Sequence, residues 1–119
     1  MTYVQGFVLA VPADKKDVYR KMAEAAWPTF RDKGALTIQE NWAVDVQKGK
    51  QTDFYRATDA KEGEEIVFSW ISWPDRATCD AAAKAMEEEG MPEGMEMPFD
   101  GMRMFWGGFE PIFTGSRSG

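Results

Sequence analysis

Histidine is absent from this sequence of 119 residues, and its absence excludes several kinds of site. Histidine is the usual general base, a common zinc ligand, the partner of serine or cysteine in nucleophilic pairs, and the proximal ligand of many haems. Any acid–base chemistry must therefore come from other side chains. The sequence indicates no cofactor.

Cysteine and long hydrophobic runs are also scarce. The single cysteine, Cys79, allows neither an intramolecular disulfide nor a multi-cysteine metal site, which indicates a reducing, cytoplasmic compartment. The methionines between Met91 and Met104 have no Cys or His among them, so we interpret them as an adaptable loop and expect no metal site. The longest apolar run, Val4 to Val11, is far shorter than the ~20 residues of a membrane helix, so no membrane partner is expected.

Positive charge is limited as well. There are 14 Lys and Arg residues against 20 Asp and Glu residues, and the net charge of -6 argues against a nucleic-acid partner. The 44% of hydrophobic residues is typical of a globular protein. The length suits a single domain, which we place at residues 1–114, followed by a disordered tail at residues 115–119.

The hydrophobic pattern predicts at least four strands. Tyr3–Val11 and Ile66–Trp73 are apolar on both alternating sets of positions, as in central strands covered on two faces. Leu36–Val46 alternates strictly and predicts a strand with Glu40 on its apolar side. Met104–Phe113 predicts the last strand, and Asp53–Thr58 has the alternation of a further strand or hairpin arm.

Two helices are predicted between these strands. The first opens at Pro12-Ala13-Asp14 with Asp14 as its cap, kinks or breaks near Trp27 because of Pro28, and ends at Gly34. The second opens at Pro74-Asp75, continues through Ala77–Glu89 and stops at Gly90, before an irregular excursion to Gly101. The expected buried stripes are Val18, Met22, Ala26 and Phe30 on the first helix and Cys79, Ala82 and Met86 on the second.

This order of elements predicts an α+β domain of the ferredoxin-like βαββαβ type. Right-handed crossovers would give one antiparallel sheet with two helices on one face. The opposite face then carries Phe, Trp, Ile and Val side chains, and an exposed apolar patch of this kind marks an interface. We therefore expect a homodimer in which two sheets pack face to face as a dimeric α/β barrel.

Several short motifs support a family assignment. They are Asp53-Phe54, Phe68-Ser69-Trp70, Met97-Pro98-Phe99-Asp100-Gly101, Arg103-Met104 and Gly107-Gly108-Phe109-Glu110. In their combination the chain resembles the bacterial YbaA-like family, a domain of unknown function, from Tyr3 to Phe113. The resemblance implies the dimeric α/β-barrel fold and a homodimer, but no activity. Wider relatives of that barrel include cofactor-independent monooxygenases, isomerases and haem enzymes, and fold alone does not fix function.

Glu40 is the candidate catalytic residue. A carboxylate among Leu36, Ile38, Trp42 and Val44 would be desolvated, which raises its proton affinity and makes it a usable general base. The other interpretation is a buried glutamate paired with an arginine or a backbone donor for structural reasons.

The remaining candidates are ligand-binding residues. Asp100 and Arg103 would orient a small polar or anionic ligand at the barrel mouth, or else form a loop-closing salt bridge. Asp53 is a similar candidate, with turn capping as its structural alternative. Trp42, Trp70 and Phe99, together with Trp106, would line an aromatic pocket, or else belong to core and interface. Ser69, the interior polar side chain of its strand, completes the set.

Two functional hypotheses follow. The first is a small-molecule-binding protein, including the case of a cofactor-independent enzyme, with Glu40 as base or polar anchor. The second is a non-catalytic dimeric binding or regulatory module, in which the aromatic surface serves assembly. The sequence leaves open the ligand, the reaction and whether the protein is an enzyme.

Overall fold

Two ten-residue strands form the centre of the sheet. In the computed structural model, which describes residues 2–90 and 97–117, β1 (Tyr3–Pro12) pairs along its whole length with β3 (Glu64–Trp73). β2 (Thr37–Trp42) pairs with the other side of β3, and β4 (Phe105–Phe109) pairs with the other side of β1. All three pairings are antiparallel and the strand order is β2-β3-β1-β4. The ferredoxin-like arrangement with two central strands is confirmed.

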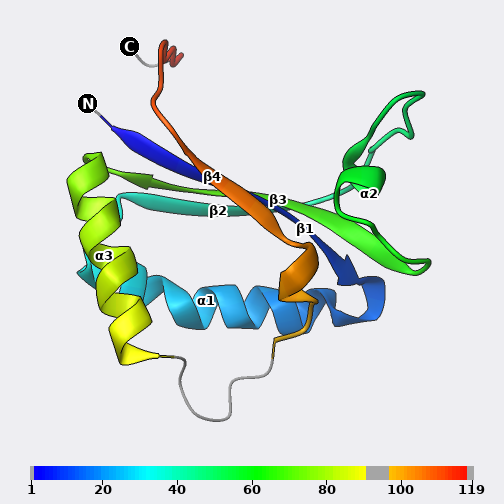
Figure 1. The fold of residues 1–119 in the computed structure, drawn as a ribbon, viewed down its shortest axis with the longest axis horizontal. Coiled ribbons are helices and arrows are strands. Elements are labelled where there is room, and N and C mark those ends of the chain that lie inside the picture. The colour runs from blue at the N-terminus through cyan, green and yellow to red at the C-terminus, as the bar shows by residue number, and fades with distance from the viewer. Residues whose placement is uncertain (1, 91–96, 118–119) are drawn as a thin grey trace.

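The two long helices cover one face of this sheet. α1 (Lys16–Asp32) follows a short 3₁₀ helix, η1 (Ala13–Lys15), and α3 (Arg76–Glu89) connects β3 toward β4. Figure 1 shows both helices on the same side of the sheet, with α1 running beneath the strands. A second 3₁₀ helix, η2 (Gly101–Arg103), lies directly before β4.

The second predicted helix is confirmed at both ends. Asp75 accepts a hydrogen bond from the Thr78 backbone N–H at 2.7 Å, which satisfies one of the free donors of the first turn. Gly90 follows the last turn with a φ of 72°, a conformation that favours glycine. Cys79 and Ala82 are buried against the sheet, as predicted.

The first helix differs from the prediction in three respects. No side chain caps its start, so Asp14 is not a cap, and the helix continues unbroken through Pro28. Pro28 is exposed, so water can solvate the carbonyl group that lacks a partner. Val18 is 45% exposed, and Tyr19 is the buried residue instead. At 100° per residue, Tyr19 lies at the centre of the stripe that the later apolar residues define, and Val18 lies at its margin.

Two strands are shorter than predicted, and one predicted strand is a helix. β2 ends at Trp42, leaving Val44 96% exposed, and β4 ends at Phe109 rather than Phe113. The Asp53–Thr58 segment forms a single helical turn, α2 (Phe54–Ala57), instead of a strand or hairpin arm. Asp53 accepts a hydrogen bond from the Arg56 backbone N–H at 2.8 Å. This cap favours a helical turn over a strand, because the short alternating segment has no strand to pair with.

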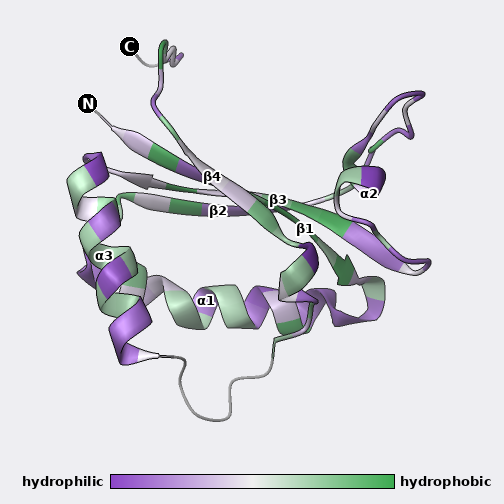
Figure 2. Cartoon of the chain, in the orientation of Figure 1, coloured by the Kyte–Doolittle hydropathy of each residue, from purple (hydrophilic) through white to green (hydrophobic). Residues whose placement is uncertain are grey.

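The main core lies between the sheet and the helices, and the opposite face is only partly covered. Figure 2 shows hydrophilic and hydrophobic bands alternating along α1 and α3, whereas β3 becomes hydrophobic soon after its hydrophilic start. On the face away from these helices, Val8, Ala10 and Ile66 pack against the segment around α2. The rest of that face, which we call the open face, exposes Phe68, Phe105 and Phe109 by 43%, 45% and 60%.

Parts of two predicted segments fall outside the described residues. These are residues 91–96 of the predicted excursion, with Met91 and Met95, and residues 118–119 of the predicted tail. Gly115 to Arg117, at the start of that tail, form no helix or strand. Within residues 2–90 and 97–117, none of the helices is long and apolar enough to span a membrane.

Candidate functional site

A cleft separates the first half of α1 from the edge of the sheet formed by β2 and β3. Its volume is about 1050 Å³, and a second hollow of about 630 Å³ extends toward the end of α3. Four residues line both spaces, so they lie where the two hollows meet. These shared residues are Tyr19 and Ala23 of α1 and Ile38 and Glu40 of β2.

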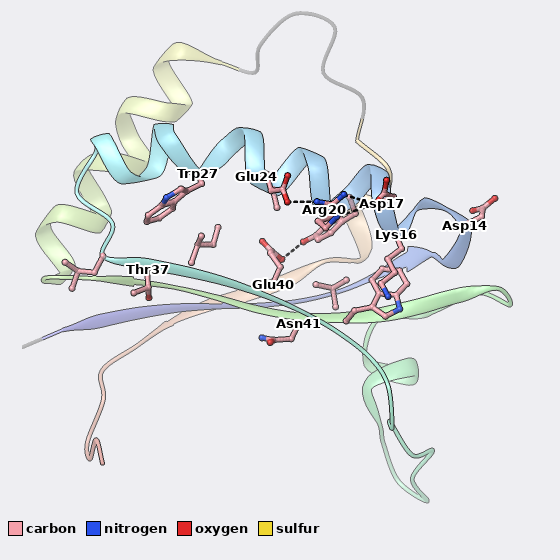
Figure 3. Close-up of a pocket in the computed structure, with 15 residues that line it drawn as sticks. Asp14, Lys16, Asp17, Arg20, Glu24, Trp27, Thr37, Glu40 and Asn41 are labelled. Carbon is pink, nitrogen blue, oxygen red and sulfur yellow. Dashed lines mark hydrogen bonds and ion pairs between the residues drawn. The ribbon is translucent and has the colours of Figure 1, made fainter. Parts of the chain in front are cut away.

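The alternation of β2 places Glu40 in this cleft. Ile38, Glu40 and Trp42 occupy the side of the strand that faces the helices, and the register sets Glu40 directly opposite Ser69 of β3. Figure 3 shows Glu40 pointing from β2 toward α1, with Trp27 reaching back from α1, whereas Asn41 points to the other side of the sheet. A one-residue change of register would remove the carboxylate from the cleft.

Hydroxyl groups hold the Glu40 carboxylate. Tyr19 Oη donates a hydrogen bond of 2.7 Å to Glu40 Oε1. Burial raises the pKa of Glu40, and the hydrogen bonds from Tyr19 and Ser69 only partly oppose this rise. Burial and the neighbouring carboxylate also raise the pKa of Tyr19, which keeps its hydroxyl protonated as a donor. Ser69 is 3% exposed, so its hydroxyl is fixed beside Glu40.

Aromatic side chains lie on two sides of the cleft that holds Tyr19 and Glu40. Phe99 packs edge-on against Tyr19, with 5.8 Å between ring centroids. At the other end, the Lys16 ammonium lies 5.5 Å from the centre of the Trp42 ring, within the range of a cation–π interaction. The segment after residue 96 therefore touches the candidate site through Phe99.

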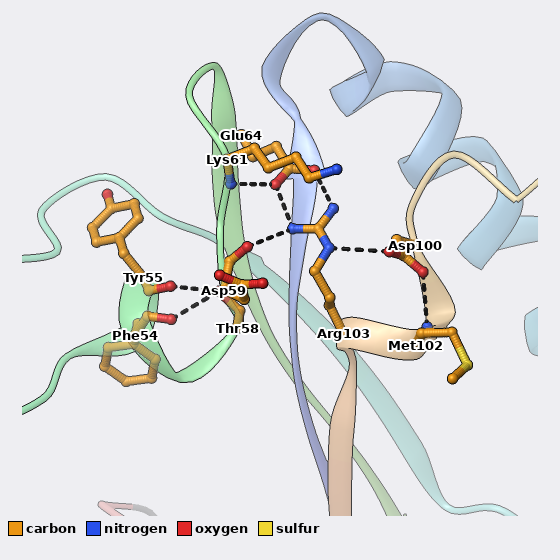
Figure 4. A network of polar contacts seen from close by, with 9 residues as sticks. All are labelled: Phe54, Tyr55, Thr58, Asp59, Lys61, Glu64, Asp100, Met102 and Arg103. Carbon is orange, nitrogen blue, oxygen red and sulfur yellow. Dashed lines mark hydrogen bonds and ion pairs between the residues drawn. The ribbon is translucent and has the colours of Figure 1, made fainter.

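Asp100 and Arg103 belong to a different cluster, centred on the guanidinium group. Arg103 donates to Glu64 at 2.6 and 2.8 Å, to Asp100 at 3.1 Å and to the Asp59 carbonyl oxygen at 2.9 Å (Figure 4). These bonds occupy four of the N–H donors of the side chain. Arg103 lowers the pKa of Glu64 to about 2, because the guanidinium favours the ionised carboxylate.

The predicted site residues therefore lie in four separate places. Glu40 and Ser69 are adjacent, with Trp42 at one end of the cleft and Phe99 behind Tyr19. Asp100 and Arg103 hold the segment before β4 to the start of β3, and Asp53 caps α2. Trp70 is on the open face, 5.7 Å from the ring of Phe68, because adjacent residues of a strand face opposite ways.

Sequence reasoning missed Tyr19, the closest partner of Glu40, and Glu64, the closest partner of Arg103. The spacing of Tyr19 from Met22, Ala26 and Phe30 also fits a helical stripe, and this signal was available in the sequence. Glu64 gave no signal, because it follows a charged turn and its partner is 39 residues away.

The described part of the chain, residues 2–90 and 97–117, contains no group of three or more Cys, Asp or Glu side chains arranged to hold a metal ion. The cleft thus offers one desolvated carboxylate, which two hydroxyl groups hold, and aromatic walls. Such a set can bind a small molecule, orient it through hydrogen bonds and accept a proton from it.

The fold and the cleft define a small α+β protein with a ferredoxin-like antiparallel sheet. Residues 2–101 match the family described as "Protein of unknown function (DUF1428)", and the chain belongs to this family. It is 58% identical over 114 residues to "Uncharacterized protein YbaA" of Escherichia coli (strain K12), covering 94% of this chain and 97% of that protein. The protein of the same name from Shigella flexneri has the same identity and coverage. The predicted relationship to the YbaA-like bacterial family is confirmed.

Two solved structures align with most of this chain, at TM-scores below 0.5. "Structure of Rv0793 from Mycobacterium tuberculosis" has a TM-score of 0.46 and 13% identity, over 98% of this chain and 100% of that chain. "De novo designed protein Foldit4" has a TM-score of 0.43 and 11% identity, over 92% of this chain and 97% of that chain.

Proposed function

We propose that this protein binds a small molecule in the cleft between α1 and the sheet, with Glu40 as its polar anchor. The observation that carries the proposal is the environment of Glu40, a carboxylate in an open cleft whose pKa is raised by burial and whose protein partners are hydroxyl groups. Burying a charge is costly unless it is compensated, and such residues cluster at functional sites. Trp42 forms an aromatic wall, and Ser69 and Tyr19 fix the carboxylate.

The proposal extends to a cofactor-independent enzyme. In that case Glu40 is the general base, because a raised pKa brings its proton affinity closer to what proton abstraction near neutral pH requires. Asp100 and Arg103 would act indirectly, by holding the segment that presses Phe99 against Tyr19.

Native mass spectrometry of freshly purified protein, followed by release under denaturing conditions, tests the binding proposal. We expect a retained small molecule in the wild type, strongly reduced in Glu40→Gln and unchanged in Glu62→Gln, a matched change at an exposed turn. Equal retention in Glu40→Gln would contradict the role of Glu40. A wild-type chain that retains nothing, and for which a small-molecule screen finds no ligand, would contradict the proposed function.

We also propose a homodimer formed through the open face. Three phenylalanines expose 43 to 60% of their surface there, and Phe54, Phe68 and Trp70 stack edge to face. A second copy packed sheet to sheet would cover these rings and form the expected dimeric α/β barrel. The same face supports the second candidate function, a non-catalytic dimeric binding or regulatory module.

Sedimentation velocity at micromolar concentration tests the dimer. We expect the wild type to sediment as a dimer and Phe105→Asp to sediment as a monomer, because a carboxylate would be buried in the contact. Ala81→Asp is the control, since Ala81 is exposed on α3, on the opposite side of the sheet from the open face (Figure 1), and it should leave the dimer intact. A monomeric wild type would refute the homodimer.

A cytoplasmic location and a single domain over residues 1–114 complete the proposal. The cytoplasmic location is supported by the one cysteine, Cys79, which is free and buried against the sheet. Cell fractionation of the source bacterium, with antibodies against the protein, tests the location directly.

A further inference from the structure

The charges around the cleft are unbalanced. Its lining includes four acidic side chains and two basic ones, and Lys21, outside the lining, pairs with Asp17 at 3.6 Å, which leaves an excess of one negative charge. Figure 3 shows most of them along α1, above the carboxylate of Glu40. The acidic residues are Asp14, Asp17, Glu24 and Glu40, and the basic residues are Lys16 and Arg20.

Neither basic side chain compensates Glu40. Arg20 donates to Asp17 at 2.8 Å and to Glu24 at 2.6 Å, so its charge is shared between two rim carboxylates. Lys16 lies over the Trp42 ring instead. Within residues 2–90 and 97–117, Glu40 forms no ion pair with lysine or arginine, although a cation would be the normal partner of a buried carboxylate.

Glu40 also has unused capacity to accept hydrogen bonds. An ionised carboxylate offers about four acceptor positions, and here Tyr19 and Ser69 supply the donors. Glu40, Trp27 and Trp42 all line the cleft, so the remaining positions can be reached from it. Indole rings attract cations at their faces, and the Lys16 ammonium already lies over one of them.

From this arrangement we infer that the ligand is a flat organic cation, a protonated amine or amidine attached to an aromatic or similarly planar framework. Its charged N–H groups donate to Glu40, and its planar part packs against the tryptophan walls. A carboxylate or phosphate ligand is disfavoured, because it would face Glu40 and the acidic rim, where Arg20 is held by Asp17 and Glu24 and Lys16 lies over the Trp42 ring. This inference rests on the proposed function and specifies the ligand class of the same cleft.

Three probes of nearly equal size and shape test the charge preference: benzamidine, which is a cation at neutral pH, neutral benzamide and anionic benzoate. Titration of the wild-type protein by isothermal calorimetry should give at least a tenfold lower Kd for benzamidine than for benzamide, which corresponds to about 1.4 kcal/mol. Benzoate should show no saturable binding. In Glu40→Gln the advantage of benzamidine over benzamide should fall below threefold.

The wild-type comparison needs no variant, so it decides the inference even if Glu40→Gln does not fold. The inference is overturned if benzamide or benzoate binds as well as benzamidine, or if none of the three binds. A small molecule retained in native mass spectrometry would leave the proposed function standing in those cases. An advantage of benzamidine that persists in a folded Glu40→Gln variant would overturn the role of Glu40 as the cation's partner.

Discussion

Two glutamates of the same sheet have opposite electrostatic surroundings. Glu64, the first residue of β3, meets the Arg103 guanidinium through two hydrogen bonds, and its pKa falls to about 2. Glu40, in the middle of β2, meets hydroxyl groups in the cleft, and burial raises its pKa. A carboxylate matched by a bidentate cation stabilises the fold, whereas one without a cation retains capacity to bind something else.

The largest expected effect comes from removing the cation of the matched pair. Arg103→Ala leaves Glu64 without its partner and also frees Asp100 and the Asp59 carbonyl group. We expect the melting temperature to fall by roughly 10 °C in differential scanning calorimetry. Arg20→Ala should change the melting temperature by about 2 °C or less, because this arginine also bonds two carboxylates but lies at the exposed rim of the cleft. Equal effects would contradict the distinction between the two clusters.

Acid should weaken the ion pair between Glu64 and Arg103. The pKa of Glu64 is about 2 in the folded protein and near 4.5 when unfolded, so its stabilising contribution is complete above pH 4.5. This contribution is lost as the pH falls from 4.5 toward 2, and after solvent screening we expect it to amount to about 2 kcal/mol. Urea unfolding across this range measures it. The Arg103→Ala variant should lose most of this acid dependence, and an unchanged slope would contradict the assignment.

Removing the Tyr19 hydroxyl group should affect Glu40. Tyr19→Phe keeps the ring against Phe99 but deletes the hydrogen bond to Glu40. We expect a loss of about 2 kcal/mol in the free energy of unfolding at neutral pH, because the donor serves a charged acceptor. The pKa of Glu40 should rise further, which NMR of the side-chain carboxyl carbon can follow. An unchanged pKa would show that Tyr19 does not interact with the carboxylate in solution.

The smallest expected effect is a gain in stability rather than a loss. The folded pKa of Glu40 lies above its unfolded value, so its contribution to stability is present below about pH 4.5 and is lost as the pH rises through the folded pKa. Glu40→Gln should therefore be more stable than the wild type at neutral pH, by about 1 kcal/mol, and this advantage should shrink toward pH 4.5. Chemical unfolding at several pH values checks this. A variant that is less stable at neutral pH would indicate that Glu40 is a structural residue.

Local signals predicted much of the fold. The central strands, the start of the second helix at Pro74-Asp75, the Gly90 stop and the position of Glu40 on the apolar side of β2 were all readable from short stretches. The errors fell where a local pattern was ambiguous. The short alternation around Asp53 also fits one capped helical turn, and the β pattern beyond Trp42 has no partner strand to pair with.

The candidate site was only half predictable, because its contacts join residues that are far apart in the sequence. The alternation of β2 identified Glu40, but its partners are 21 residues away at Tyr19 and 29 residues away at Ser69. Asp100 and Arg103 form a pair, as one of the two interpretations expected, yet Arg103 also binds Glu64 and neither residue lines the cleft.

By itself, the sequence determined the absence of histidine, the single cysteine, the acidic balance and the alternation that sends Glu40 toward the helices. These are properties of composition and of neighbouring residues, which the chain carries in any conformation. Only the tertiary structure decided which carboxylate has a cation and which does not, because α1 and η2 bring Tyr19 and Arg103 to the sheet from distant segments. Desolvation and ion pairing depend on those long-range contacts, and they distinguish a structural glutamate from a candidate binding residue.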